Sequence, residues 1–241
     1  MVGFNTAALL TAWEQAFADP PVQRAVRLLS AAPPEKAVEE WARLRVGDRD
    51  SALLDLQDSM FGDALETATP CPRCGEQVEL AFTTQQVRVD SARAENFTLT
   101  EGGYQVTYRP PTSEDLLGLP RHSMEAARTA LLARCVDAAV RNGQAVPVED
   151  LPVPVVEAVT KGIADADPQA EVSIAIACPE CGFQWSMDFD IASYLWTEIQ
   201  EWAHRTLRDV HTLASAYGWS EREVLEMSSQ RRGLYLGMVE G

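Results

Sequence analysis

Cys71-Pro72-Arg73-Cys74-Gly75 and Cys178-Pro179-Glu180-Cys181-Gly182 are two copies of one short motif, and they contain four of the five cysteines in the chain. A Cys-x-x-Cys turn points two thiolates at one metal ion, so two such turns supply the four soft ligands of a tetrahedral zinc site. The proline restricts φ, and the glycine tolerates the positive φ that lets the chain curl around a metal. The pattern predicts one Zn²⁺ bound by Cys71, Cys74, Cys178 and Cys181. A shell filled by protein leaves no position for water or substrate, so this zinc would be structural.

Each motif is followed by a stretch that alternates polar and apolar residues, namely 77–82 and 183–189. Alternation of this kind is typical of a strand, so each cysteine pair is expected to form a knuckle on a β-hairpin. A redox Cys-x-x-Cys pair would instead open a helix after a strand. Disulfides are the other alternative, but nothing marks the chain as secreted, and thiols at this spacing in a reducing compartment are more often metal ligands. Cys135, in an alanine-rich run, is interpreted as a small buried apolar residue.

The expected fold is α+β, mainly helical, with helices surrounding a split four-cysteine zinc ribbon made of two β-hairpin knuckles. The sequence divides into an N-terminal helical region, a β module in two pieces, a helical insertion and C-terminal helices: 1–66, 67–110 with 171–189, 111–170 and 190–241. The metal would therefore close a long loop, which in principle removes much entropy from the unfolded chain.

Local signals predict the helices inside these regions. Gly47 is expected to end one helix and Asp48 or Asp50 to cap the next. Residues 123–141 read as one alanine-rich helix, and residues 190–217 as a long helix that Gly218 ends. Ser220 and Glu223 form a capping box at the start of a last helix.

Composition limits the classes of partner. The chain has 241 residues, 46% of them apolar, and a formal net charge of −16. Non-specific nucleic-acid affinity comes from lysine and arginine, so we expect no nucleic-acid ligand. The N-terminus carries no basic leader and no apolar run approaches the length of a membrane span, so we expect a cytoplasmic protein without membrane insertion.

No recognisable catalytic motif stands out. The three histidines, His122, His204 and His211, indicate no catalytic site. His204 and His211 lack a third ligand or a spaced carboxylate and are expected to be partly exposed helix residues. Asp48-Arg49-Asp50 admits a carboxylate-pair hydrolase, although a capping and salt-bridging turn is the simpler interpretation. The tryptophans on apolar helix faces are expected to be core or interface anchors rather than a ligand pocket: Trp13, Trp41, Trp196 and Trp202. Arg231-Arg232 is interpreted either as a helix-end charge pair or as a docking contact.

Several short segments together resemble the T4-type baseplate proteins, the hub and hub-assembly chaperone proteins of contractile phage tails and of phage-tail-like contractile injection systems. They are Leu9-Leu10-x-x-Trp13-Glu14, Gly47-Asp48-Arg49-Asp50 with Leu53-Leu54, Phe61-Gly62 before the first cysteine motif, Tyr108-Arg109-Pro110-Pro111-Thr112, Trp219-Ser220-Glu221-x-x-Val224-Leu225 and Arg231-Arg232-x-x-Tyr235-Leu236. The resemblance implies a non-enzymatic assembly factor or structural component of a baseplate. A zinc-ribbon regulatory or adaptor protein and an uncharacterised hydrolase are the alternatives.

The resemblance also implies partners, which would be other baseplate or hub proteins. The segment from Trp219 to Val239 begins with a capping box and is rich in apolar residues, so it could be a docking helix. The alternative is that it packs on the core of its own chain.

Overall fold

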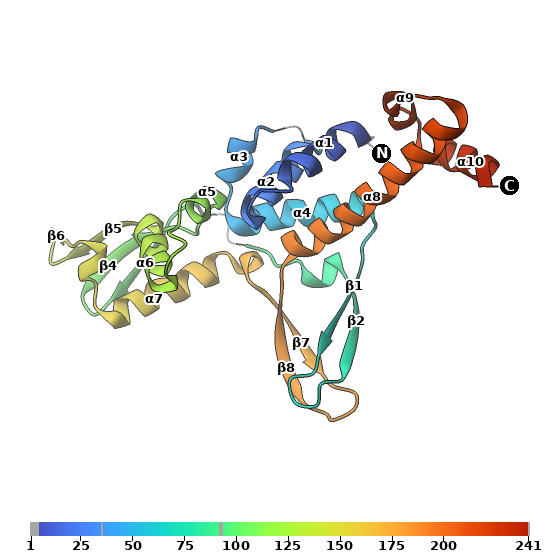
Figure 1. The fold of residues 1–241 in the computed structure, drawn as a ribbon. Helices are drawn as coiled ribbons and strands as arrows, with labels where there is room; N and C mark the ends of the chain where they lie inside the picture. Colours follow the sequence, from blue (N-terminus) through green and yellow to red (C-terminus); the bar gives the residue numbers. More distant parts are fainter. Residues whose placement is uncertain (1–4, 35, 92–93, 241) are drawn as a thin grey trace. The chain divides into compact units, whose positions relative to one another are not determined.

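The computed structural model describes residues 5–34, 36–91 and 94–240, without the side chain of residue 240 (Figure 1). The chain forms two compact units. We call them the terminal unit, made of the residues up to Val38 together with those from Ala192 onward, and the central unit, Glu39–Ile191.

The terminal unit is helical. Its elements are α1 (Thr6–Ala16), α2 (Pro21–Ser30), α8 (Ile191–Tyr217), α9 (Glu221–Leu225) and α10 (Ser229–Glu240). The side chain of Asn5 caps α1 by accepting a hydrogen bond from the amide of Ala8 at 3.1 Å, as its position before the apolar stripe predicts. The capping box of Ser220 and Glu223 is present at the start of α9.

The central unit contains the other helices and all the strands. The α-helices are α3 (Val38–Ala42), α4 (Val46–Met60), α5 (Ser113–Leu117), α6 (Met124–Cys135) and α7 (Val153–Ala166). Short 3-10 helices follow β2, precede α7 and follow α7: η1 (Thr84–Val87), η2 (Val148–Asp150) and η3 (Pro168–Ala170).

A four-stranded antiparallel sheet with the order β3-β4-β5-β6 forms one core of the central unit. Its strands are β3 (Phe97–Glu101), β4 (Tyr104–Tyr108), β5 (Val136–Arg141) and β6 (Gln144–Ala145). Helix α7 packs on this sheet through Val155 and Val159. Gly162 of α7 lies against the Tyr108 hydroxyl, where an added Cβ would collide with it. Glycine at this position therefore lets the Tyr108 side chain pack closely against α7.

The predicted helix over 123–141 is wrong in its second half. The helix α6 ends at Cys135, and Val136 begins β5, which pairs with β4. The stretch expected as a helical insertion, 111–170, thus contains strands β5 and β6 besides its helices. Asn142 and Gly143 form the turn between those strands with φ of 50° and 77°. Asn-Gly is typical of a two-residue hairpin turn, but the alanine-rich sequence before it favours the prediction of a helix.

The predicted start of α4 is also wrong. Gly47 does not end a helix but lies within α4. This helix begins at Val46, and its N-cap residue Arg45 makes no capping hydrogen bond with its side chain. The cap comes from Asp167, whose Oδ2 accepts from the amide of Gly47 at 2.8 Å, while its Oδ1 accepts from Ser91 Oγ at 3.0 Å. A carboxylate far away in the sequence thus satisfies an orphan amide at the helix N-terminus.

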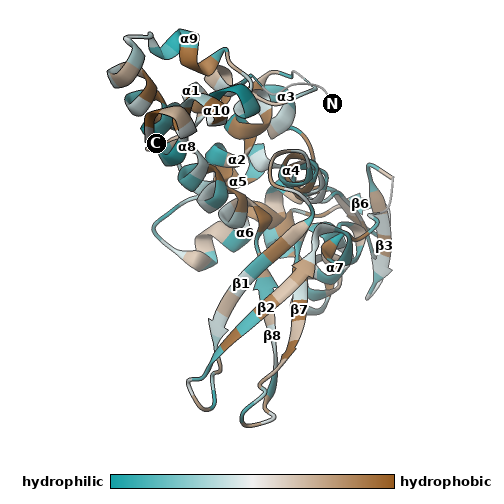
Figure 2. Ribbon diagram, turned by 90° about the vertical axis from the view of Figure 1, so that its right-hand side faces the viewer, coloured by the Kyte–Doolittle hydropathy of each residue, from teal (hydrophilic) through white to brown (hydrophobic). Residues whose placement is uncertain are grey.

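Two further hairpins complete the central unit: β1 (Ala64–Pro70) with β2 (Gln77–Thr83), and β7 (Val172–Ala177) with β8 (Gln184–Phe189). Their loops lie at the same end of the module, and their strands show the alternation of hydrophilic and hydrophobic residues that the sequence predicts (Figures 1 and 2). Gln169 of η3 accepts from the amide of Val89 at 2.7 Å and donates to the carbonyl of Val87 at 3.3 Å. These bonds hold the chain that leaves the first hairpin close to the segment that enters the second.

Candidate metal centre

The two hairpins carry the four cysteines in their loops. Strand pairing ends at Pro70 opposite Gln77 in one hairpin and at Ala177 opposite Gln184 in the other. Each loop therefore begins with the first cysteine of its motif and has the same length. The hairpins predicted from the alternation after each motif are present, so the knuckle topology is as expected.

The two loops also share their hydrogen bonds. The amide of Cys71 donates to the carbonyl of Glu76 at 2.7 Å, and the amide of Cys178 donates to that of Phe183 at 2.9 Å. Gly75 and Gly182 each donate their amide to the carbonyl of the first cysteine, at 2.9 and 3.0 Å, with φ of 79° and 67°. Positive φ strains any residue with a Cβ, which explains the glycine in both copies.

The four thiol sulfurs form one cluster. Their Sγ atoms all lie within 4.8 Å of one another, with 3.7 Å between Cys71 and Cys181 and 3.6 Å between Cys74 and Cys178. A tetrahedral zinc with Zn–S bonds of about 2.3 Å requires sulfur–sulfur separations of roughly 3.8 Å. A disulfide requires about 2.05 Å. The separations thus fit four thiolates around one metal ion.

An apolar layer supports the cluster. Cys71 and Cys178 are buried together with Val78 and Ile176, and side chains from both hairpins pack against them. Phe82 and Phe189 meet edge to face with ring centroids 5.3 Å apart. This layer packs the two hairpins against each other beside the four thiols.

The electrostatics of the loop favour a thiolate at Cys71. Burial raises the pKa of this thiol, but the backbone amides of Cys74 and Arg73 and the neighbouring thiols outweigh burial and lower the pKa to about 7. The pKa of Cys74 is raised to about 12: the Glu76 amide lowers it, and burial and the three other thiols raise it more. Cys71 therefore releases its proton near neutral pH, whereas Cys74 would need a bound cation to lose its proton.

Within the described ranges, these cysteines are the one group of three or more histidine, cysteine or acidic side chains that could hold a metal ion. Cys135 is not among them. It is 1% exposed, which agrees with its interpretation as a buried apolar residue. His122, His204 and His211 are all exposed, and His204 contacts the ring of Trp13 edge to face.

The Asp48-Arg49-Asp50 segment forms salt bridges, as predicted, but it lies within α4 and is not a capping turn. Asp48 pairs with Arg45 at 3.0 Å, and Asp50 pairs with Arg49 at 2.6 Å. Burial raises the pKa of Asp50 to about 6, although Arg49 opposes this shift. The Arg49 guanidinium also donates to Ser113 Oγ at 3.3 Å, so the side chains of this segment connect α4 to α5.

The tryptophans and the arginine pair have different environments. Trp13 and Trp41 are core residues, whereas Trp196 and Trp202 are half-buried, with Arg24 stacked over Trp196 at 4.6 Å. Arg232 is buried and lies 3.5 Å from Asp209, while Arg231 is exposed beside the Tyr235 ring.

The C-terminal segment is partly buried and partly exposed. Val224 and Leu225 of α9 are buried in the terminal unit, whereas Leu234 and Met238 of α10 are 63% and 67% exposed. Among the described helices, none has the length and apolar character that crossing a membrane requires.

Comparison with known protein families gives a match over most of the chain. A family model described as T4 bacteriophage base plate protein matches residues 25–196, a span that includes the whole central unit. No curated protein and no solved structure matches the chain.

Proposed function

The chain belongs to the T4 bacteriophage base plate protein family, and on this premise we propose that it is a non-enzymatic component or assembly factor of a baseplate. The particle would be a contractile phage tail or a phage-tail-like injection system, and the role would be that of a hub or hub-assembly protein. The match over residues 25–196 carries this proposal. The protein acts in the cytoplasm of the producing cell, where such particles are built, and it can remain in the finished particle.

The proposal includes a structural zinc ion held by Cys71, Cys74, Cys178 and Cys181. Zinc supplies a cross-link that prefers four soft thiolates in tetrahedral geometry. The separations of the sulfur atoms and the matched loop hydrogen bonds support this assignment. Two features of the chain support the site: the apolar layer excludes water from one side of the cysteine cluster, and the backbone amides around Cys71 stabilise its thiolate.

The exposed part of the C-terminal segment supports a docking role for α10 toward another baseplate protein. Leu234 and Met238 are one helical turn apart, so their side chains lie on the same face. Large exposed apolar side chains that adjoin one another are typical of interaction sites. The buried α9 gives this helix a fixed attachment to the terminal unit.

The assembly role is tested by deleting the gene in the producing organism and imaging the particles by electron microscopy. We expect particles without a functional baseplate, with restoration by the wild-type chain. Leu234→Asp together with Met238→Asp should restore poorly, and Ser229→Asp together with Gln230→Asp, which adds the same two charges at exposed positions elsewhere on α10, should restore fully. Normal, contracting particles in the deletion strain would refute the proposed function.

A further inference from the structure

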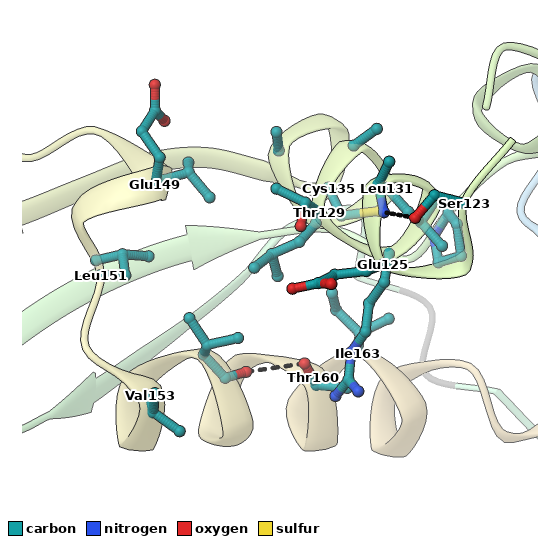
Figure 3. A pocket seen from close by; sticks show the side chains of 18 residues that line it. Ser123, Glu125, Thr129, Leu131, Cys135, Glu149, Leu151, Val153, Thr160 and Ile163 are labelled. Atoms are coloured by element: carbon teal, nitrogen blue, oxygen red, sulfur yellow. Dashed lines mark hydrogen bonds between the residues drawn. The ribbon is translucent and has the colours of Figure 1, made fainter. Parts of the chain in front are cut away.

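A groove of about 1210 Å³ lies in the central unit between α6, α7 and the segment around η2. Figure 3 shows Val153, Thr160 and Ile163 along α7 on one side, with Glu125 extending from α6 toward them. Nothing in the sequence patterns had indicated this feature, because its walls come from separate helices.

Helix α7 has two apolar faces. One face, which includes Val155 and Val159, is buried on the sheet. The other lines the groove with residues spaced three, four and three apart: Val153, Val156, Thr160 and Ile163. Val153 is 69% exposed and Thr160 is exposed, whereas Val156 and Ile163 are partly buried and also pack against the sheet core, so the open part of this face is at Val153 and Thr160. The three-four spacing is that of a seam into which another helix packs its side chains.

Helix α6 forms the opposite wall and is unusually open. Of its twelve residues, all of them described, only Cys135 is buried. Ala126, Ala130 and Ala133 line the groove at spacings of four and three. Small side chains at a contact reduce the distance between helix axes, so this wall allows an incoming helix to approach closely and leaves room for large side chains.

The volume, length and charge of the groove indicate what kind of partner fits it. Sites for small molecules are typically about 300–1,000 Å³, which is smaller than this groove. The seam on α7 covers about three turns, or roughly 15 Å of helix. The charged residues that line the groove are two glutamates and one arginine: Glu125, Glu149 and Arg128. An excess of carboxylates favours a partner with lysine or arginine beside its apolar face.

We propose that this groove binds an amphipathic helix of another baseplate protein. The helix would have about three turns, leucine-sized residues at three-four spacing facing α6 and α7, and basic residues facing Glu125 and Glu149. The inference rests on the proposed baseplate function and specifies the kind of partner. It differs from the docking role of α10, because the two surfaces belong to different units of the chain.

The test uses the full chain co-expressed with the baseplate proteins encoded beside it. Thr160→Trp fills the groove from an exposed position, and Lys161→Trp adds the same ring next to it on α7, at a residue that does not line the groove. We expect Thr160→Trp to lower co-purification by on the order of tenfold, the loss of one anchoring contact, with Lys161→Trp unchanged. Glu125→Lys should lower co-purification in a salt-dependent way. Melting temperatures of the purified variants confirm that each is folded.

A photo-reactive benzoylphenylalanine at Val153 identifies the occupant by mass spectrometry. A cross-link to a helical, basic segment of a baseplate protein supports the inference. A cross-link to a second copy of this chain, or equal co-purification of Thr160→Trp and wild type, overturns it while leaving the proposed function intact. If the wild-type chain co-purifies with none of the baseplate proteins, both the function and the inference fail.

Discussion

Replacing Cys178 with serine should remove the proposed zinc and destabilise the whole central unit. The thiols that meet in the cluster are 104 and 110 positions apart in the sequence. The metal therefore joins two hairpins that the unfolded chain would otherwise hold far apart.

The size of the effect follows from this separation. In the chain-entropy treatment of cross-links, closing a loop of about 100 residues is worth about 4.7 kcal/mol. Typical domains are stable by about 5–15 kcal/mol, so the cross-link is a large share of the total. For a unit of roughly 150 residues, each kcal/mol shifts the melting temperature by about 2–4 °C. We expect Cys178→Ser to melt about 10–20 °C below wild type.

The assay is thermal unfolding followed by circular dichroism, together with zinc analysis of the same samples. Cys135→Ala is the matched control, because it removes a buried thiol of the same unit that lies outside the cluster. This control should keep its zinc and melt within a few degrees of wild type, since it loses one small buried group. Wild-type protein stripped with a chelator should behave like Cys178→Ser.

Two results would refute the reasoning. A Cys178→Ser variant that keeps a full complement of zinc would show that the cysteine is not a ligand. A variant that loses zinc and still melts with the wild type would show that the metal is peripheral and does not brace the fold.

Three other measurements address separate parts of the account. Gly47→Ala should lower the free energy of unfolding in urea by about 1–3 kcal/mol, because the new Cβ displaces the Asp167 carboxylate from the amide of residue 47. The control Gly237→Ala has open space around it and should stabilise α10 by about 1 kcal/mol. Equal effects of the two substitutions would contradict the capping of α4 by Asp167. Burial raises the pKa of Asp50 from 3.8 to about 6, so the folded state favours its protonated form. Wild type should therefore lose about 2 kcal/mol of stability relative to Asp50→Asn as pH rises from about 4 to 7; a pH-independent difference would oppose this. With a net charge of −16, the chain should show no sub-micromolar, salt-sensitive gel shift with DNA or RNA at physiological ionic strength, and such a shift would favour a zinc-ribbon regulator.

Features specified by neighbouring residues could be predicted from the sequence. The cysteine knuckles depend on a few adjacent residues, and glycine at positions 75 and 182 permits the positive φ that these turns adopt. The capping box at Ser220 is local in the same sense. The long helix α8 is specified by a sustained apolar period.

Features that depend on distant pairing could not be predicted. Val136–Arg141 contains two alanines and continues a helical pattern, but its pairing with β4 overrides that propensity. The cap on α4 comes from Asp167, which is 120 positions from Gly47. The groove between α6 and α7 likewise exists only once two helices have been placed by the sheet. In each case the deciding partner is remote in the sequence.

Elemental analysis of the purified full chain, combined with X-ray absorption at the zinc edge, tests the central claim most directly. The account predicts one zinc per chain, coordinated by four sulfur atoms at about 2.3 Å. Protein purified without chelators that contains no zinc, or zinc bound through nitrogen and oxygen ligands, would contradict it.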